Sequence, residues 1–141
     1  MIMKLEKVDV LVLTETHSLA DSPPSVRGLT VLSHTGISAN RAGDAICALD
    51  SGRWSCLSSK ELVPGHTIIS NLYNSVSTET FALLGVYGNI SSYAARTSFY
   101  EDLYTSLSDH ILSINSDTAS PSCWCRCLAA GDWNFVEKDS D

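Results

Sequence analysis

Long hydrophobic runs are missing from this sequence, and no apolar stretch approaches the roughly 20 residues that a membrane helix needs. The first eight residues alternate charged and apolar types, so they lack the apolar core of a secretory signal. These absences favour an intracellular protein, of the cytoplasm or nucleus, that has no membrane contact. At 141 residues and 44% hydrophobic content, the chain is long and apolar enough for one globular domain spanning 1–141.

Positive charge is also scarce. Nine Lys and Arg residues stand against 16 Asp and Glu residues, which gives a net charge of −7 and a pI near 4.9. This balance argues against broad binding to a nucleic-acid backbone, which normally uses a basic face. Two explanations remain open for a nucleic-acid enzyme: carboxylates gather around a bound metal, or basic binding residues lie outside this chain.

The five cysteines do not form an even set, and without a secretory signal a disulfide framework is not expected. Cys123, Cys125 and Cys127 alternate along the chain, which places them on one face of a strand. Zinc sites usually separate their cysteines by two or more residues and need a turn to close a tetrahedron. We therefore expect a buried apolar strand here in preference to a zinc site.

Short apolar runs bounded by polar or turn-forming residues predict a series of strands. The predicted strands are 8–13, 29–33, 44–49, 53–57, 66–73, 80–87 and 124–130. An Asp-Ser-Gly turn at 50–52 predicts that 44–49 and 53–57 form a hairpin.

The period changes between residues 91 and 115, where apolar residues recur every four positions from Phe99 to Ile111. This spacing predicts an amphipathic helix, capped by Ser91 or Ser92. The order of elements, with many short strands and then a helix and a final strand, predicts an α/β or α+β fold with mixed, mostly antiparallel sheets.

Polar side chains follow three of the predicted strands at the point where each strand ends. Glu15 comes after the first strand, Tyr87 and Asn89 come at the end of the sixth, and Asp132 and Asn134 follow the last. Ligand sites in layered α/β proteins gather just beyond strand ends. These five residues are therefore the first candidates for a functional site.

Three motifs occur in order: Thr-Glu-Thr-His at 14–17, Val-Tyr-Gly-Asn at 86–89 with a later Arg96 and Phe99, and Gly-Asp-Trp-Asn at 131–134. In this order they resemble the endonuclease/exonuclease/phosphatase superfamily, and within it the endonuclease domains of non-LTR retrotransposons. The resemblance covers nearly the whole chain from residue 8. It implies a partial four-layer α/β/β/α sandwich and a DNA endonuclease that depends on Mg²⁺ (or Mn²⁺). A downstream reverse transcriptase domain is the candidate partner in a full-length element.

The resemblance also implies residue roles. Glu15 matches the carboxylate that binds the divalent metal. Asp132 matches a residue at the metal that orients or deprotonates the attacking water, and Asn134 matches a contact to phosphate. Tyr87 matches a tyrosine near the scissile phosphate. The chemistry is consistent with these roles, because Mg²⁺ takes oxygen ligands, keeps several waters and stabilises the negative charge that develops on a phosphate.

Four further residues are weaker candidates for contacts to phosphate or substrate. Asn89 matches a family asparagine, although it lies one residue closer to Tyr87 than in the usual pattern. His17 and Arg96 match phosphate-side positions, and each could equally be a surface residue. Asp141 matches an acidic residue downstream of the 131–134 motif, and it could instead fray at the end of the chain.

Two departures from the family pattern limit the prediction. The family's Asn after its first strand and its late Asp-His pair have no counterpart at the expected places, so we expect them to lie outside this chain. Ser-Asp-His at 108–110 spells the late motif, but it precedes 131–134 and falls within the predicted helix. We expect it to be a solvated helix turn. Two alternatives stay open: a phosphatase or exonuclease of the same fold, and a catalytically inactive fragment or interaction module.

Overall fold

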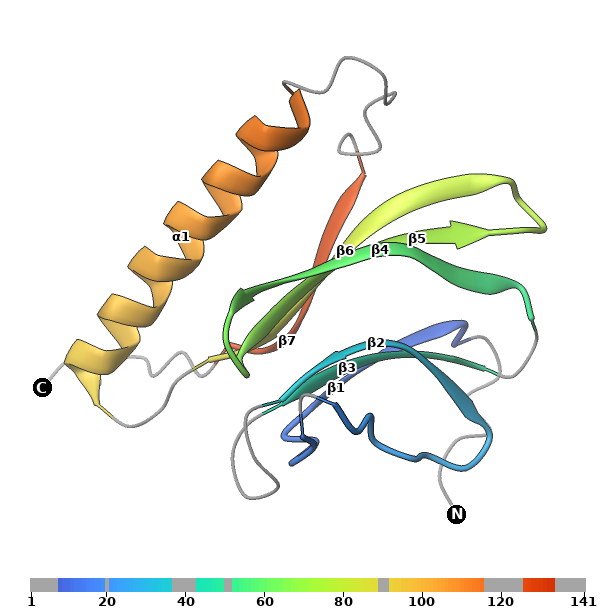
Figure 1. The fold of residues 1–141 in the computed structure, drawn as a ribbon, viewed down its shortest axis with the longest axis horizontal. Coiled ribbons are helices and arrows are strands. Elements are labelled where there is room, and N and C mark those ends of the chain that lie inside the picture. The colour runs from blue at the N-terminus through green and yellow to red at the C-terminus, as the bar shows by residue number, and fades with distance from the viewer. Residues whose placement is uncertain are drawn as a thin grey trace, which may run out of the picture.

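The structure is a computed structural model, and it describes residues 8–19, 21–36, 43–49, 52–88, 92–115 and 126–133. These residues form two β-sheets that lie face to face, with one helix on the outer face of the larger sheet (Figure 1). This confirms the predicted α/β class and supplies three of the four predicted layers.

The smaller sheet has three antiparallel strands in the order β1-β3-β2. Its strands are β1 (Val10–Thr14), β2 (Leu29–Thr35) and β3 (Asp44–Leu49). β3 is the central strand, and its five residues from Asp44 to Ala48 are all buried. The sheet therefore has β1 and β2 as its two edges.

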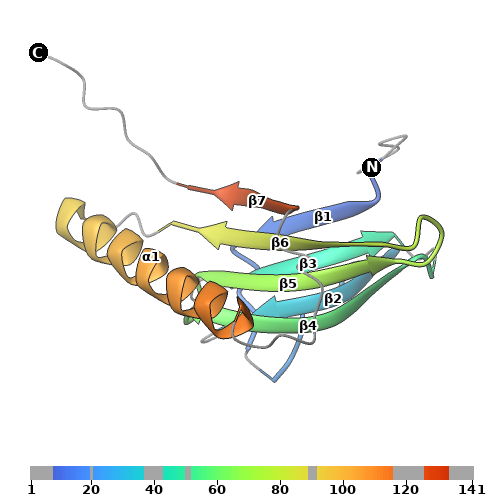
Figure 2. The ribbon, with the colours of Figure 1, turned by 90° about the horizontal axis from the view of Figure 1, so that it is seen from above.

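The larger sheet has four strands in the order β4-β5-β6-β7, and its last pair, β6 and β7, is parallel. Its strands are β4 (Trp54–Val63), β5 (Thr67–Asn74), β6 (Glu79–Tyr87) and β7 (Cys127–Asp132). Figure 2 shows β7 and β1 near one another at the same side of the two sheets. Between β6 and β7 the chain runs through the helix α1 (Tyr93–Asn115), as a parallel connection requires.

Alternation of side chains along β6 fills two apolar layers at once. Leu84 and Val86 point to the helix, where they pack with Phe99 and Leu103. Leu83 points the other way and packs between the sheets, against Ile46 of β3 and other buried residues. The central strands β5 and β6 are thus largely buried, while the edge strands β4 and β7 are mostly exposed.

The predicted helix is confirmed. α1 begins close to the expected position, and the backbone N–H of Ala95 donates a 3.1 Å hydrogen bond to Oγ of Ser92, which is the predicted cap. Phe99 and Leu103 of the predicted apolar stripe are buried against the sheet. Among the described residues, no helix combines the length and the apolar character needed to cross a membrane.

The predicted hairpin between 44–49 and 53–57 is wrong. β3 pairs with β1 and β2, whereas β4 pairs with β5, so the turn-forming segment joins two different sheets. Both edges of β3 are already occupied, and β4 continues to Val63 to pair along the whole of β5. A turn signal predicts a change of direction, but it does not say which strand the next one will pair with.

The prediction of a buried strand around Cys127 is also wrong in part. A strand does form, but β7 is at the edge of its sheet, and Cys127 and Leu128 are exposed. Cys123 and Cys125 lie outside the described residues. An apolar composition therefore marked the strand correctly, while its position at a sheet edge decided its burial.

Candidate active site

The ends of β6 and β7 bring two of the predicted site residues side by side. Tyr87 and Asp132 are the last residues of these parallel strands and are register partners. The backbone N–H of Gly88 donates a 2.7 Å hydrogen bond to the carbonyl oxygen of Asp132, which extends the pairing past the strand ends. Alternation places both side chains on the face that looks toward the smaller sheet, as for Leu83 and Ala130.

Gly131 explains how β7 can approach β6 so closely. Its φ is 143°, in a region that side-chain-bearing residues rarely adopt, and a Cβ built there would lie 1.9 Å from the carbonyl oxygen of Val86. No other residue fits without moving β7. The glycine before Asp132 is therefore required by the backbone that positions this carboxylate.

Glu15 reaches the same place from the opposite sheet. The Tyr87 hydroxyl donates a 2.6 Å hydrogen bond to Oε1 of Glu15, although the two residues are 72 positions apart in the sequence. Glu15 itself has a left-handed backbone with φ of 55°. Such conformations are costly for non-glycine residues and cluster at functional sites.

The loop that carries Glu15 is held against the start of β3. The N–H of Thr16 donates a 3.0 Å hydrogen bond to the carbonyl oxygen of Gly43. Gly43 has a φ of 109°, and a Cβ there would lie 2.5 Å from Oγ1 of Thr16. The close approach of these two segments fixes Glu15 at the mouth of the sandwich.

The Tyr87 phenol is held in its protonated form. Its hydrogen bond to Glu15 raises the pKa of Tyr87 to about 12, with further contributions from partial burial and from the negative charges of Glu15, Asp132 and Asp44. At neutral pH this hydroxyl is a hydrogen-bond donor. A donor at this position can stabilise an anionic oxygen.

Asp44 is a second carboxylate at the site that the sequence analysis did not single out. It is the first residue of β3, the register partner of Thr14, and fully buried. Neither of its carboxylate oxygens has a hydrogen-bond partner among the described residues. Burial raises the pKa of Asp44 to about 8. An acidic residue at the start of the apolar run 44–49 was the available sequence signal.

His66 is the other residue that sequence reasoning left without a role. Its ring stacks on Tyr87 with centroids 5.6 Å apart and an interplanar angle of 7°, and its edge contacts Phe99. Its Nδ1 lies 2.9 Å from the carbonyl oxygen of Tyr87, and its own carbonyl accepts a 2.7 Å hydrogen bond from the N–H of Tyr87. His66 therefore fixes the orientation of the phenol. Its position after Pro64-Gly65 gave no signal of this.

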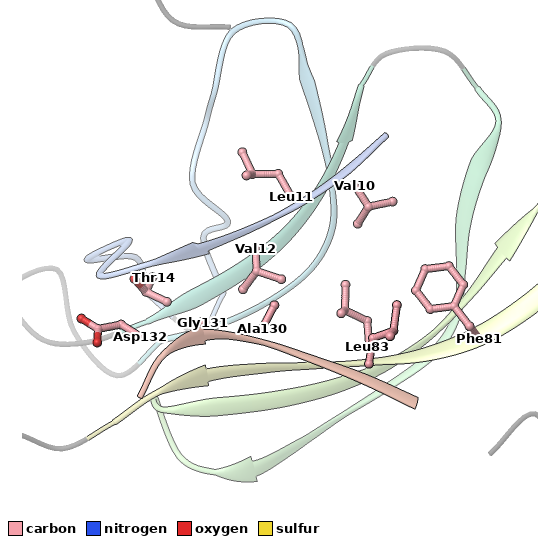
Figure 3. A pocket seen from close by; sticks show the side chains of 10 residues that line it. Val10, Leu11, Val12, Thr14, Phe81, Leu83, Ala130, Gly131 and Asp132 are labelled. Carbon is pink, nitrogen blue, oxygen red and sulfur yellow. The ribbon is translucent and has the colours of Figure 1, made fainter. Parts of the chain in front are cut away.

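A groove of about 550 Å³ runs between the edge strands β1 and β7 and leads to this site. Most of its lining is apolar, and Thr14 and Asp132 lie close together at one end (Figure 3). The polar end of the groove coincides with the strand ends that carry Tyr87 and Glu15. We call the group formed by Glu15, Asp44, Tyr87 and Asp132 the strand-end cluster.

The remaining predicted residues fall into three groups. Arg96 is half-buried in the first turn of α1, and its charge opposes the rise in the pKa of Tyr100 that burial and Asp132 cause. It therefore borders the site. His17 is exposed two residues beyond Glu15, with a left-handed φ of 50°. Asn89, Asn134 and Asp141 lie outside the described residues.

The Ser-Asp-His sequence at 108–110 lies on α1, as predicted from its periodicity. Burial and the nearby charge of Lys60 lower the pKa of His110, which places this histidine beside β4. It is therefore separate from the strand-end cluster, which is formed by β1, β3, β6 and β7.

The oxygen donors of the cluster suit a hard divalent cation. Glu15 and Asp132 both border the Tyr87 hydroxyl, one by a hydrogen bond and one through its charge. Within the described residues, no three His, Cys, Asp or Glu side chains gather closely enough to hold an ion directly. Mg²⁺ keeps several waters and needs only one or two protein carboxylates, so Glu15 and Asp132 are the residues that would hold it.

The described part of the chain thus has two face-to-face sheets, a helix outside them and carboxylates from both sheets at one end. A comparison with solved structures identifies a protein of similar fold. The catalytic domain of human nocturnin, in a structure with a bound sulfate anion, matches with a TM-score of 0.53 and 18% identity over 91% of this chain. At that identity the likeness concerns the fold.

The chain spans about half of the nocturnin chain, since the match covers 52% of it. No protein-family model matches the sequence, and no curated protein matches it either. The fold is therefore established through structure, while the site residues rest on the motifs and on the geometry described above.

Proposed function

We propose that this chain belongs to a divalent-metal-dependent phosphodiesterase that hydrolyses DNA, of the endonuclease type found in retroelements. The observation that carries the proposal is the convergence of Glu15, Tyr87 and Asp132 from three strand ends, with a direct hydrogen bond between the first two. These are the residues that the family motifs single out.

A bound Mg²⁺ or Mn²⁺ would neutralise the negative charge that develops on the phosphate oxygens. Glu15 and Asp132 would supply its carboxylate ligands. Asp132 also accepts the proton of the attacking water, while the water oxygen bonds to phosphorus and the bond to the leaving oxygen breaks. When substrate binds, Tyr87, protonated and oriented by His66, exchanges its hydrogen bond to Glu15 for one to a non-bridging oxygen.

The remaining candidates contact the substrate in this proposal. Asn134 and Asn89 bind phosphate oxygens, while His17, Arg96 and Asp141 border the path of the nucleic acid. The sulfate in the nocturnin structure supports an anion-binding fold, because sulfate resembles phosphate in shape and charge. The expected location, in the cytoplasm or nucleus, suits a DNA substrate.

Supercoiled plasmid incubated with the purified chain and Mg²⁺ or Mn²⁺ tests the proposal. We expect nicking that requires the metal and that falls by about 10²-fold or more in Asp132→Ala, because this change removes the proposed base. Asp109→Ala is the matched control, since Asp109 is an exposed carboxylate on α1 away from the cluster. Equal loss in both variants would contradict the assignment of Asp132.

A panel of phosphomonoesters and linear DNA ends separates the related activities. Release of inorganic phosphate without nicking would favour a phosphatase, and stepwise shortening from an end would favour an exonuclease. A reverse transcriptase reading frame directly downstream in the genome would favour the retroelement type.

The second candidate is a catalytically inactive fragment or an interaction module. In the described part of the chain, β1 and β7 each pair on one side only, and the groove between them is mainly apolar, with Leu128 61% exposed. Unpaired edges and exposed apolar surface favour association with other chains. Absence of both nicking and Mg²⁺ binding in calorimetry would support this candidate.

A further inference from the structure

The side chain of Asp44 is the least satisfied polar group of the described residues. It is fully buried, and both of its carboxylate oxygens are without a hydrogen-bond partner there. Leaving one buried polar group unsatisfied costs about 1–3 kcal/mol, and more for a charged group. A buried carboxylate in this state therefore calls for a compensating ligand.

The direction of the Asp44 side chain follows from the alternation along β3. Ile46, two residues later, packs between the sheets against Leu72 and Leu83, so Asp44 also faces the interior of the sandwich. Its register partner Thr14 lies beside Asp132 at the polar end of the groove (Figure 3). The side chain of Asp44 therefore faces the strand-end cluster from the interior of the sandwich.

The charge of Asp44 also reaches the centre of the cluster. It acts on the Tyr87 hydroxyl together with the charges of Glu15 and Asp132. The Tyr87 hydroxyl is thus within electrostatic range of all three carboxyl groups, which agrees with the direction of Asp44 given by the alternation along β3.

We propose that Asp44 is a third carboxylate of the divalent-cation site, and that it holds water carried by the cation from inside the sandwich. The inference rests on the proposed function, because it uses the same site. It adds a residue outside the three motifs. Carboxylates that hold metal-bound water need not lie at direct bonding distance from the ion.

Isothermal titration calorimetry of the full chain with MgCl₂ and with MnCl₂ tests this inference without relying on catalysis. Asp44→Asn keeps the shape and removes the charge. We expect it to raise the Kd of the cation by about tenfold to a hundredfold, which is the usual effect of losing a supporting ligand. Glu15→Gln and Asp132→Asn should weaken binding at least as much.

Asp9→Asn is the matched control. Asp9 is an exposed carboxylate just before β1, where it forms an ion pair with Arg53, and the same chemical change there should leave cation binding unaltered. The increase in melting temperature that the cation causes should also be smaller in Asp44→Asn than in the wild type. A purely structural role of Asp44 would change the melting temperature without changing its dependence on the cation.

The outcomes separate the two proposals. If Asp44→Asn binds the cation as tightly as the wild type while Glu15→Gln and Asp132→Asn do not, this inference is overturned and the proposed function stands. If the wild type binds neither cation, both are overturned. If Asp44→Asn does not fold, Asp44→Ser, a smaller neutral variant, takes its place with the same expected loss.

Discussion

The strands of the sandwich have an apolar middle and a polar end, and one gives way to the other within two to four residues. On β3, Ile46 is buried among apolar side chains between the sheets, while Asp44 on the same face is buried without a partner. On β6, Leu83 belongs to the apolar layer and Tyr87 to the strand-end cluster. The middle holds the sheets together, and the ends form the proposed site at a cost in stability.

The largest effect should come from the apolar middle. Ile46→Ala removes a fully buried side chain and leaves a cavity, so we expect the free energy of unfolding to fall by about 2–5 kcal/mol. Urea denaturation measures it. Leu49→Ala, at the exposed end of the same strand, should cost no more than about 1 kcal/mol. Equal costs would show that the sheets are not packed at Ile46.

The next effect concerns the buried end of β3. Burial raises the pKa of Asp44 to about 8, above its unfolded value of roughly 3.9, so the folded state binds the extra proton between these values. The contribution of Asp44 to the free energy of unfolding is therefore present at low pH and is lost as pH rises. The loss is up to about 1.4 kcal/mol per pH unit between pH 5 and 7.

The measurement is the difference in free energy of unfolding between the wild type and Asp44→Asn, taken by urea denaturation without divalent cations at several pH values. Taking the difference cancels the titration of the other carboxylates. As pH rises, the free energy of unfolding of Asp44→Asn should increase relative to that of the wild type. A difference that stays constant from pH 5 to pH 7 would show that Asp44 titrates normally.

The smallest effect concerns the link between the two sheets at the site. Tyr87→Phe removes the hydrogen bond to Glu15, and we expect a loss of about 0.5–1.5 kcal/mol, since Glu15 can turn to water. Tyr104→Phe, on an exposed face of α1, is the control and should have no effect. A loss as large as that of Ile46→Ala would mean that this bond holds the sandwich together.

Much of the fold follows from local patterns. Periodicity predicted α1, and short apolar runs located the seven strands found in the described residues. The pairing of the strands did not follow from local patterns, as the wrongly predicted hairpin at 50–52 shows. Which edge a strand joins depends on contacts between distant segments, such as β1 with β3, and no local signal encodes them.

The residues of the candidate site could likewise be predicted from the sequence only in part. Glu15, Tyr87 and Asp132 could be selected from motifs at strand ends, and the structure brings them together. Asp44 and His66 could not, because their importance comes from neighbours far away in sequence: the strand facing Asp44 and the phenol on which His66 stacks. Their roles, and those of the motif residues, stay predictions until the variants are measured.

The close contact at Gly131 changes how the Gly-Asp-Trp-Asn sequence should be compared among copies of such a chain. In the proposed function the aspartate is a chemical requirement, whereas the glycine is a spatial one, because any side chain there would strike the carbonyl oxygen of Val86. A copy that kept Asp132 and lost Gly131 would keep its reactive group and lose the place where that group must stand. Under the proposed function, loss of the glycine at residue 131 would therefore mark an inactive gene copy as clearly as loss of the aspartate at residue 132.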